Sequence, residues 1–187
     1  MKNKLAILDL DETLIFGTQK KLDRSEDFKV SEYYVYKRPH LNEFILEIYK
    51  HYEIAFWSSA GDEYVQQVTS KIKPKNIEFE FVWSRDKAVY QRNFEEHGDV
   101  ESHYHYVKPL KKVKKLGYNL SDFLIIDDSP HKCKLNFGNA IYPKAYEGAL
   151  IDDELCVLSK YLQLIKEKKD FRRIEKRNWK TKMKNYH

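Results

Sequence analysis

The sequence predicts an α/β fold in three layers, with a mostly parallel central sheet between helices. Short apolar runs, typical of buried strands, alternate along the chain with segments whose apolar residues recur at helical spacing. Polar clusters directly follow three of the apolar runs, at residues 9–13, 58–59 and 127–128. Because sites in such sheets gather at the carboxyl ends of the strands, we expect these clusters to lie close together.

Six segments are predicted to be strands. Four are continuous apolar runs, a fifth alternates apolar and other residues, and a sixth is short and aromatic. The continuous runs are 5–8, 54–57, 123–126 and 140–142, the alternating segment is 79–83, and the aromatic segment is 33–36. The stretch 16–30 is polar and mixed.

Four segments are predicted to be helices. The first opens at Pro39 with apolar residues on one face, and the second ends before Pro74. The third is short and closed by Gly117, and the fourth is amphipathic and closes the fold. Their apolar positions are Leu41, Phe44, Ile45, Ile48, Tyr49 and Tyr52; Tyr64, Val65, Val68 and Ile72; Leu110, Val113 and Leu116; and Leu155, Leu158, Leu162 and Ile165.

The chain is long enough for one domain, since it has 187 residues and 42% hydrophobic content. We assign residues 1–164 to this domain, with a small β-rich insertion at about 79–106, and residues 165–187 to a basic C-terminal tail or helix end. No segment is large and self-contained enough to form a lid domain. The site is therefore expected to be open to macromolecules.

The net charge of +5 is concentrated at the C-terminal end. Residues 165–187 carry ten lysines or arginines against three acidic residues, a net +7, which leaves about −2 for the remainder. This segment predicts either a basic arm that favours an acidic partner, nucleic acid or a phosphorylated protein, or a solvated helix end.

No stretch approaches the roughly 18 apolar residues of a membrane span, and the first residues do not resemble a signal peptide. We expect a soluble intracellular protein with no membrane partner, cytoplasmic, or nuclear in a eukaryote. Cys133 and Cys156 are too few for a disulfide framework and are expected to be idle thiols. His103 and His105 lack zinc-ligand partners at suitable spacing and are expected to lie on a strand face.

Asp9 and Asp11 form a pair of carboxylates at the end of the first strand. Such a pair suits covalent phosphoryl transfer, in which one carboxylate attacks phosphorus and the other protonates the leaving oxygen and later activates water. A divalent ion is needed for a carboxylate to approach a phosphate dianion, and the hard oxygen ligands Asp127 and Asp128 favour Mg²⁺.

Lys108 and Ser58 would supply donors for the phosphate oxygens. Each of these signals is weak alone, because an Asp-X-Asp is commonly a turn, a serine at a strand end a cap, and one lysine among many a surface residue. Adjacent acids after an apolar run are more specific, since two carboxylates that repel each other need a cation nearby. The order and placement of all four features carry the prediction.

Residues 5–14, Leu-Ala-Ile-Leu-Asp-Leu-Asp-Glu-Thr-Leu, resemble the first motif of the haloacid-dehalogenase superfamily. Residues 56–58, Lys108 and residues 126–130 resemble its second, third and fourth motifs in the expected order. Within it, residues 37–44, 106–108 and 127–130 are most similar to the small phosphatases of the RNA polymerase II C-terminal repeats, also called NLI-interacting-factor-like phosphatases. The likeness covers roughly residues 4–161.

The resemblance implies a Rossmann-like fold without a large cap, in which Asp9 is the nucleophile and Asp11 the acid/base. It implies Mg²⁺ held by Asp9, the backbone carbonyl of Asp11 and Asp128, with Asp127 nearby and paired to Lys108. Lys108 is expected to be catalytic as well. The residues expected to bind substrate are Thr13, Ser58 and Lys108, and Thr13 would also support the loop that carries Asp9 and Asp11. Arg38 is expected to support the site or to form a structural salt bridge, and Arg85 is a weaker candidate for a substrate contact.

The predicted function is therefore Mg²⁺-dependent hydrolysis of phosphomonoesters through an aspartyl phosphate, on phosphoserine or phosphothreonine of a protein. The alternatives are a polynucleotide or nucleotide phosphatase that removes, for example, a 3′-phosphate, and an inactive phosphopeptide-binding module. Motif order disfavours a phospho-accepting receiver domain, Asp11 disfavours a dehalogenase, and the lack of a cysteine with a downstream arginine disfavours a protein tyrosine phosphatase.

Overall fold

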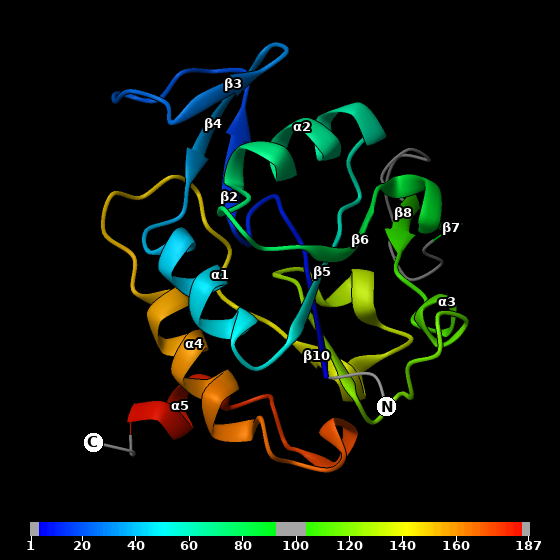
Figure 1. Cartoon of the computed structure of the whole chain (residues 1–187). Helices are drawn as coiled ribbons and strands as arrows, with labels where there is room; N and C mark the ends of the chain where they lie inside the picture. The colour runs from blue at the N-terminus through cyan, green and yellow to red at the C-terminus, as the bar shows by residue number, and fades with distance from the viewer. Residues whose placement is uncertain (1–3, 93–103, 185–187) are drawn as a thin grey trace.

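The computed structural model describes residues 4–92 and 104–184, and a five-stranded parallel sheet forms its centre (Figure 1). The order across the sheet is β10-β9-β1-β5-β6, and every neighbouring pair is parallel. The strands are β1 (Leu5–Leu8), β5 (Glu53–Trp57), β6 (Phe79–Trp83), β9 (Phe123–Ile126) and β10 (Ala140–Ile141). The predicted α/β class with a mostly parallel sheet is confirmed.

Both faces of the central sheet are covered, which makes the predicted three layers. Because successive side chains of a strand point to opposite faces, Ala6 and Leu8 of β1 join one apolar cluster while Leu5 and Ile7 join the other. This two-sided burial explains why the central strands are continuous apolar runs in the sequence.

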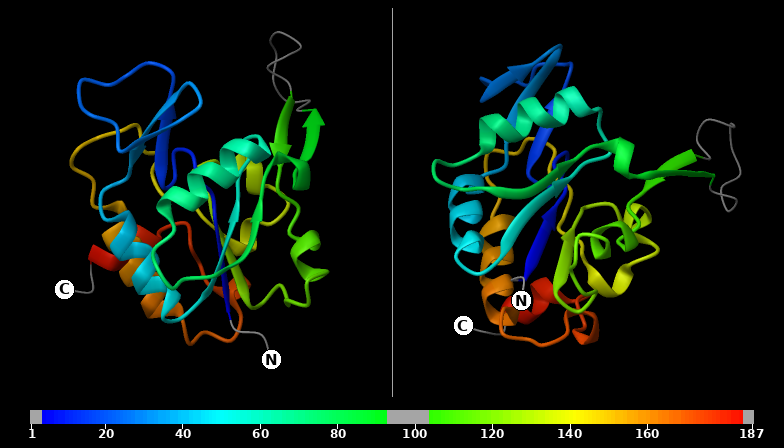
Figure 2. Two further views of the ribbon diagram at one scale, coloured as in Figure 1. Left: turned by 45° about the horizontal axis from the view of Figure 1, so that its top comes forward. Right: turned by 45° about the vertical axis from the view of Figure 1, so that its right-hand side comes forward.

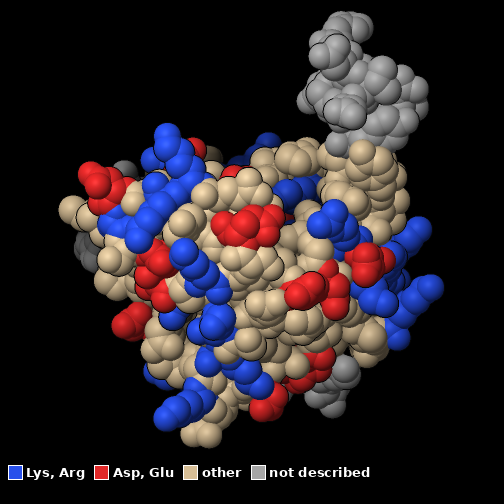
Figure 3. Space-filling model, turned by 90° about the horizontal axis from the view of Figure 1, so that it is seen from above, with Lys and Arg blue, Asp and Glu red and all other residues tan. Residues whose placement is uncertain are grey.

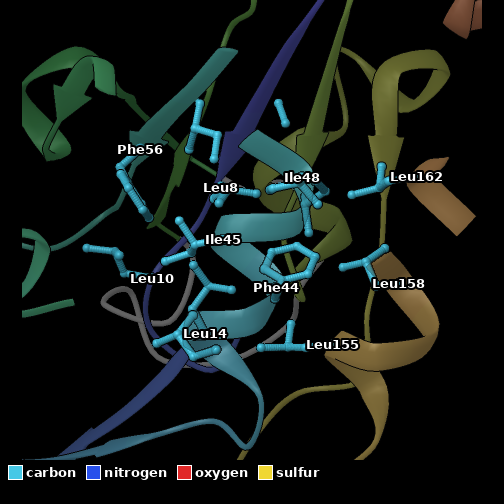
Figure 4. Packing of buried hydrophobic residues seen from close by; sticks show 14 of the residues in the cluster. Leu8, Leu10, Leu14, Phe44, Ile45, Ile48, Phe56, Leu155, Leu158 and Leu162 are labelled. Carbon is cyan, nitrogen blue, oxygen red and sulfur yellow. The ribbon is translucent and has the colours of Figure 1, made fainter. Parts of the chain in front are cut away.

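Three helices cover the first face: α1 (Leu41–Tyr49), α2 (Asp62–Ile72) and α4 (Glu154–Ile165). Figure 4 shows Phe44, Ile45 and Ile48 of α1 between the strands and the leucines of α4. Tyr49 departs from the prediction, since it is 39% exposed. The second face has a thinner cover, α3 (Lys111–Lys114) and the 3₁₀ helix η3 (Pro130–Cys133), and a second 3₁₀ helix, η4 (Phe137–Asn139), precedes β10.

A second, antiparallel sheet lies beyond the carboxyl ends of the central strands, in the order β2-β4-β3 (Figure 1). Its strands are β2 (Ile15–Thr18), β3 (Phe28–Val30) and β4 (Tyr33–Lys37). Only β4 matches a predicted strand, since no strand was predicted at β2 or β3. Most residues of β2 and β3 are only partly buried, so these strands lack the apolar runs that mark the central ones.

A hairpin of β7 (Val89–Arg92) and β8 (Tyr104–Val107) projects from the body beside β6 (Figure 2). The 3₁₀ helix η1 (Arg85–Lys87) leads into it. Residues 79–83, at the start of the predicted insertion at about 79–106, form β6, an edge strand of the central sheet. Residues 93–103 of the predicted insertion, including His103, lie outside the described residues.

The C-terminal segment packs against the domain rather than extending as a tail. It contains the 3₁₀ helix η5 (Phe171–Arg173) and α5 (Trp179–Lys184), and Phe171 and Trp179 are buried in the main apolar cluster. Within the described residues the apolar core therefore continues past residue 164. Single apolar residues among many charges gave too weak a helical period to reveal this packing.

Candidate active site

The predicted polar clusters come together at the carboxyl end of the central sheet. Asp9 follows β1, Ser58 follows β5 and Asp127 follows β9. Leu8 of β1 lies opposite Phe56, the next-to-last residue of β5, and opposite Ile126, the last residue of β9. The three strands therefore end at the same edge of the sheet. The side chains of Asp9, Ser58 and Asp127 are all buried there.

Two lysines hold the Asp9 carboxylate, one on each oxygen. The Lys108 ammonium lies 2.9 Å from Oδ1 of Asp9 and 2.6 Å from Oδ2 of Asp127. The Lys132 ammonium lies 3.1 Å from Oδ2 of Asp9. Lys108 directly follows β8, and Lys132 is in η3. Segments far apart in the sequence thus supply the charges around Asp9.

These contacts decide the charge of Asp9. Burial raises the pKa of its carboxyl, but Lys108 and Lys132 outweigh burial and lower the pKa to about 2. Burial and the charge of Asp9 instead raise the pKa of Asp127, which Lys108 partly offsets. Asp9 is therefore fully ionised near neutral pH, as a nucleophile must be.

Asp11 points to different partners. Its Oδ1 accepts a hydrogen bond of 2.7 Å from the Tyr64 hydroxyl of α2, and burial raises its pKa to about 6. A carboxyl with such a pKa exchanges a proton readily near neutral pH, which suits an acid/base. Gly17 in β2 makes this contact possible, because a methyl group there would overlap the Tyr64 hydroxyl.

The loop after β1 takes an unusual backbone turn at Glu12, with φ at 61°. The Thr13 hydroxyl donates to Oδ1 of Asp128 at 3.2 Å and accepts the Asp128 N–H at 3.1 Å. Its side chain is fully buried, so Thr13 joins the two acidic loops. Its predicted part in substrate binding has no separate observation behind it and stays a prediction.

Arg38 supports this loop from behind and also forms a salt bridge, so both expectations for it are met. Its Nε and Nη2 donate to the two carboxylate oxygens of Asp152 at 2.8 and 2.9 Å. Its Nη1 donates to the Thr13 carbonyl at 2.9 Å. The whole side chain is buried, and the bidentate geometry makes the arrangement rigid.

Beside Asp11 a cavity of about 460 Å³ opens between β4, α2 and η1. Tyr33, Tyr64 and Arg85 are among its lining residues. Arg85 and Asp11 thus line the same cavity, and a substrate contact by Arg85 stays a prediction. Ser58 lies on the floor of the site, and its Oγ accepts the N–H of Ala60 at 3.0 Å, so its hydroxyl proton remains available to another acceptor.

The carboxylates of Asp9, Asp127 and Asp128 could hold a metal ion, because one oxygen from each lies within 4.8 Å of the others. Three hard oxygen donors fit Mg²⁺ rather than a softer ion. The Asp11 carboxylate is not in this group, so the predicted ligation by Asp11 rests on its backbone carbonyl alone. No histidine or cysteine joins a comparable cluster within residues 4–92 and 104–184.

Sequence reasoning missed two residues of the site. Lys132 is one of 34 lysines and arginines, and Tyr64 is one of 14 tyrosines, so neither stands out by type. The position of Lys132 four residues after Asp128, in a turn opened by Pro130, was the available signal. Tyr64 was assigned only to the apolar face of its helix.

Residues 4–172 match the model of the family described as NLI interacting factor-like phosphatase. The chain belongs to this family. Phosphatase Herzog of Drosophila melanogaster is 28% identical over 162 residues, which cover 83% of this chain and 42% of that protein. The CTD small phosphatase-like protein of Homo sapiens is 25% identical over 174 residues, 89% of this chain and 58% of that protein. This family member thus spans about half the length of these curated relatives.

Solved structures resemble this NLI interacting factor-like phosphatase in fold. Fission yeast RNA polymerase II CTD phosphatase Fcp1, bound to beryllium fluoride, superposes with a TM-score of 0.57 at 18% identity, covering 98% of this chain and 62% of that one. A substrate-bound phosphoserine phosphatase gives a TM-score of 0.50 at 16% identity, covering 86% of this chain and 99% of that one. The predicted haloacid-dehalogenase fold is confirmed. Among the described helices, none is both long and apolar enough to cross a membrane.

Proposed function

We propose that the chain is a Mg²⁺-dependent phosphomonoester hydrolase that acts on phosphoserine or phosphothreonine of a protein through an aspartyl phosphate. The observation that carries the proposal is the contrast between two neighbouring carboxylates. Asp9 is ionised between two ammonium groups, and Asp11 has a pKa raised to about 6 beside Tyr64. A nucleophile and a proton donor are the two groups that such a reaction needs.

In the first step, a carboxylate oxygen of Asp9 forms a bond to phosphorus, and the bond from phosphorus to the leaving oxygen breaks. Asp11 gives its proton to that oxygen, which departs as the free hydroxyl. In the second step, Asp11 takes a proton from water, the water oxygen attacks phosphorus, and the Asp9 carboxylate leaves. Phosphate is released and both side chains return to their starting states.

Asp9, Asp127 and Asp128 would hold Mg²⁺, with the Asp11 carbonyl as the further ligand expected from the family. When bound, the ion neutralises negative charge between nucleophile and phosphate. Ser58 and Lys108 would contribute donors to the phosphoryl oxygens. Thr13 and Arg38 keep the loops of the site in register through Asp128 and Asp152.

A protein substrate is supported by the absence of a cap domain from the described residues and by two similar proteins. One is named a CTD small phosphatase-like protein, and the other is the RNA polymerase II CTD phosphatase Fcp1. In Figure 3, which looks from above toward the carboxyl ends of the strands, acidic and basic side chains lie interspersed. Nucleic acid binds preferentially to surfaces of uniformly positive charge, so this face of mixed charge suits a peptide better.

The alternative, a polynucleotide or nucleotide phosphatase, was favoured by the basic C-terminal segment. The first part of that segment lies at the amino end of the sheet, because the Lys4 ammonium donates to the carbonyls of Lys166 and Lys168, and Phe171 N–H bonds to the Ser121 carbonyl just before β9. Asp9 lies at the opposite end of these strands. Residues 166–171 are therefore remote from a phosphate bound at Asp9.

Hydrolysis of an aryl phosphate near neutral pH would test the proposal, with Mg²⁺, with EDTA, and with the Asp9→Asn variant. Activity should be lost in both controls. Phosphoserine and phosphothreonine peptides should then be cleaved faster than a 3′-phosphorylated oligonucleotide. The reverse preference, with salt-sensitive oligonucleotide binding, would favour the alternative. Phosphopeptide binding without turnover, unchanged in Asp9→Asn, would favour the inactive binding module.

A further inference from the structure

Lys132 lies among the three carboxylates that form the candidate metal site. Its ammonium is 3.1 Å from Asp9, 3.8 Å from Asp127 and 4.0 Å from Asp128. No requirement of the fold explains this, since Lys108 already pairs with Asp9 and Asp127. A second ammonium in the same cluster needs a chemical explanation.

The backbone holds Lys132 in place. The Lys132 carbonyl accepts the N–H of Lys108 at 2.8 Å, which joins η3 to the end of β8. The Lys132 N–H donates to the Ser129 carbonyl at 3.1 Å within the turn opened by Pro130. The two lysines are thus fixed relative to each other by main-chain bonds, and both side chains converge on Asp9.

The two lysines differ in access to solvent. The side chain of Lys108 is 0% exposed, whereas that of Lys132 is 18% exposed. Lys108 is enclosed by the carboxylates it pairs with. Of the two lysines that contact Asp9, Lys132 is therefore the one that solvent, and a phosphoryl group arriving from it, can reach.

The net charge of the carboxylate cluster indicates what Lys132 does there. Three carboxylates and two ammonium groups leave one net negative charge, and a bound Mg²⁺ would turn it into one net positive charge. Without Lys132 the loaded cluster would be neutral and would lose its attraction for a phosphate dianion. The same ammonium repels an incoming Mg²⁺, so it strengthens phosphate binding at the expense of metal binding.

We propose that Lys132 is a catalytic residue that binds the phosphoryl oxygens during transfer to Asp9 and at the same time weakens the affinity of the carboxylates for Mg²⁺. The inference rests on the proposed phosphatase function. As charge spreads over the phosphoryl oxygens in the transition state, an ammonium beside the nucleophile stabilises them.

The test is calorimetric titration of wild type and Lys132→Gln, first with MgCl₂ and then with inorganic phosphate at saturating Mg²⁺. The variant should bind Mg²⁺ at least about tenfold more tightly and phosphate at least about tenfold more weakly, because one charge acts with opposite sign on the two ions. Aryl phosphate hydrolysis at saturating Mg²⁺ should fall about a hundredfold. Lys132→Arg should retain part of the phosphate affinity.

Lys134→Gln is the matched control, since it removes the same charge from the exposed residue just after η3 and should change neither affinity. Unchanged affinities in Lys132→Gln, or both affinities reduced together with the melting temperature, would overturn the inference and leave the proposed function standing. A wild-type protein that binds Mg²⁺ and phosphate without hydrolysing any phosphomonoester would instead reject the proposed function. Wild type that binds neither ion would overturn both.

Discussion

The hydrogen bond from Tyr64 to Asp11 links a helix side chain to the acid/base, and its removal should slow turnover without unfolding the protein. Tyr64→Phe keeps the ring that lies against Tyr33 but deletes the hydroxyl. We expect kcat to fall about tenfold, since a hydrogen bond to an ionisable group contributes about 1.5 kcal/mol or more. Steady-state kinetics on an aryl phosphate measures this, and an unchanged kcat with an unchanged melting temperature would contradict it.

Gly17→Ala tests the contact between Tyr64 and Asp11 from the side of β2. The new methyl group would meet the Tyr64 hydroxyl and would lie 3.3 Å from Oδ1 of Asp11. Because Tyr64 must move, kcat should fall at least as much as in Tyr64→Phe, while the double variant should lose little more than either single one. Additive losses in the double variant would show that Gly17 acts through something else.

Lys176 predicts a dependence of stability on pH. It is buried, its ammonium donates to the carbonyls of Phe171 and Ile174, and burial lowers its pKa from 10.5 to about 8. Between these two values the unfolded chain holds the proton and the folded chain does not, so the free energy of unfolding rises with pH in this window.

Lys176→Met removes the titrating group and provides the reference. Urea unfolding at pH 7.5 and at about pH 9.5 should show the wild type gaining stability relative to the variant at the higher pH. Parallel curves for the two proteins would mean that Lys176 keeps an ordinary pKa in the folded chain.

Asp9, Asp11, Asp127 and Asp128 could be proposed from the sequence because they follow recognisable strands, and Lys108 because it completes a known order of motifs. The pairing of Lys108 with Asp127 was also expected. Lys132 and Tyr64 could not be predicted in the same way. Lys132 lies in a 3₁₀ turn and Tyr64 on a helix, and their contacts depend on how these two elements are oriented toward Asp9 and Asp11. The spacing of apolar residues does not specify that orientation.

The extent to which each helix or strand is buried decided whether its position could be predicted from the sequence. The strands of the central sheet and helices α1, α2, α3 and α4 have continuous or periodic apolar patterns, and their positions were predicted within a few residues. β2 and β3 belong to a small sheet that is only partly buried. η5 and α5 are too short for a period, and each is fixed by one large aromatic residue.

The C-terminal element is predicted to contribute to the stability of the whole domain. Phe171→Ala should destabilise the protein by about 3–5 kcal/mol, because the ring is fully buried and its loss leaves a cavity. Arg173→Ala is the control, since that side chain is 89% exposed in the same turn. Thermal unfolding with equal melting temperatures for Phe171→Ala and wild type would mean that this segment is only a loosely attached arm.

At the scale of the molecule, three carboxylates at one end of the sheet should couple metal binding to folding. A ligand that binds only the folded state stabilises it by about 2.7 kcal/mol at a hundred times its Kd. Thermal unfolding after dialysis against EDTA should therefore show a higher melting temperature when Mg²⁺ is restored. The increase should be much smaller in Asp128→Ala, which removes the ligand oxygens, and an equal increase in that variant would place the ion elsewhere.

The position of β1 sets an order of events during protein synthesis. β1 precedes the other strands of the central sheet in the chain, yet it lies between β5 and β9, and its loop is held by Arg38 together with Asp152. A nascent chain therefore cannot complete the centre of its sheet until residue 126 has left the ribosome, or brace the Asp9 loop until residue 152 has followed. Residues as distant as 152 must therefore be translated before β1 and the loop after it acquire their native surroundings.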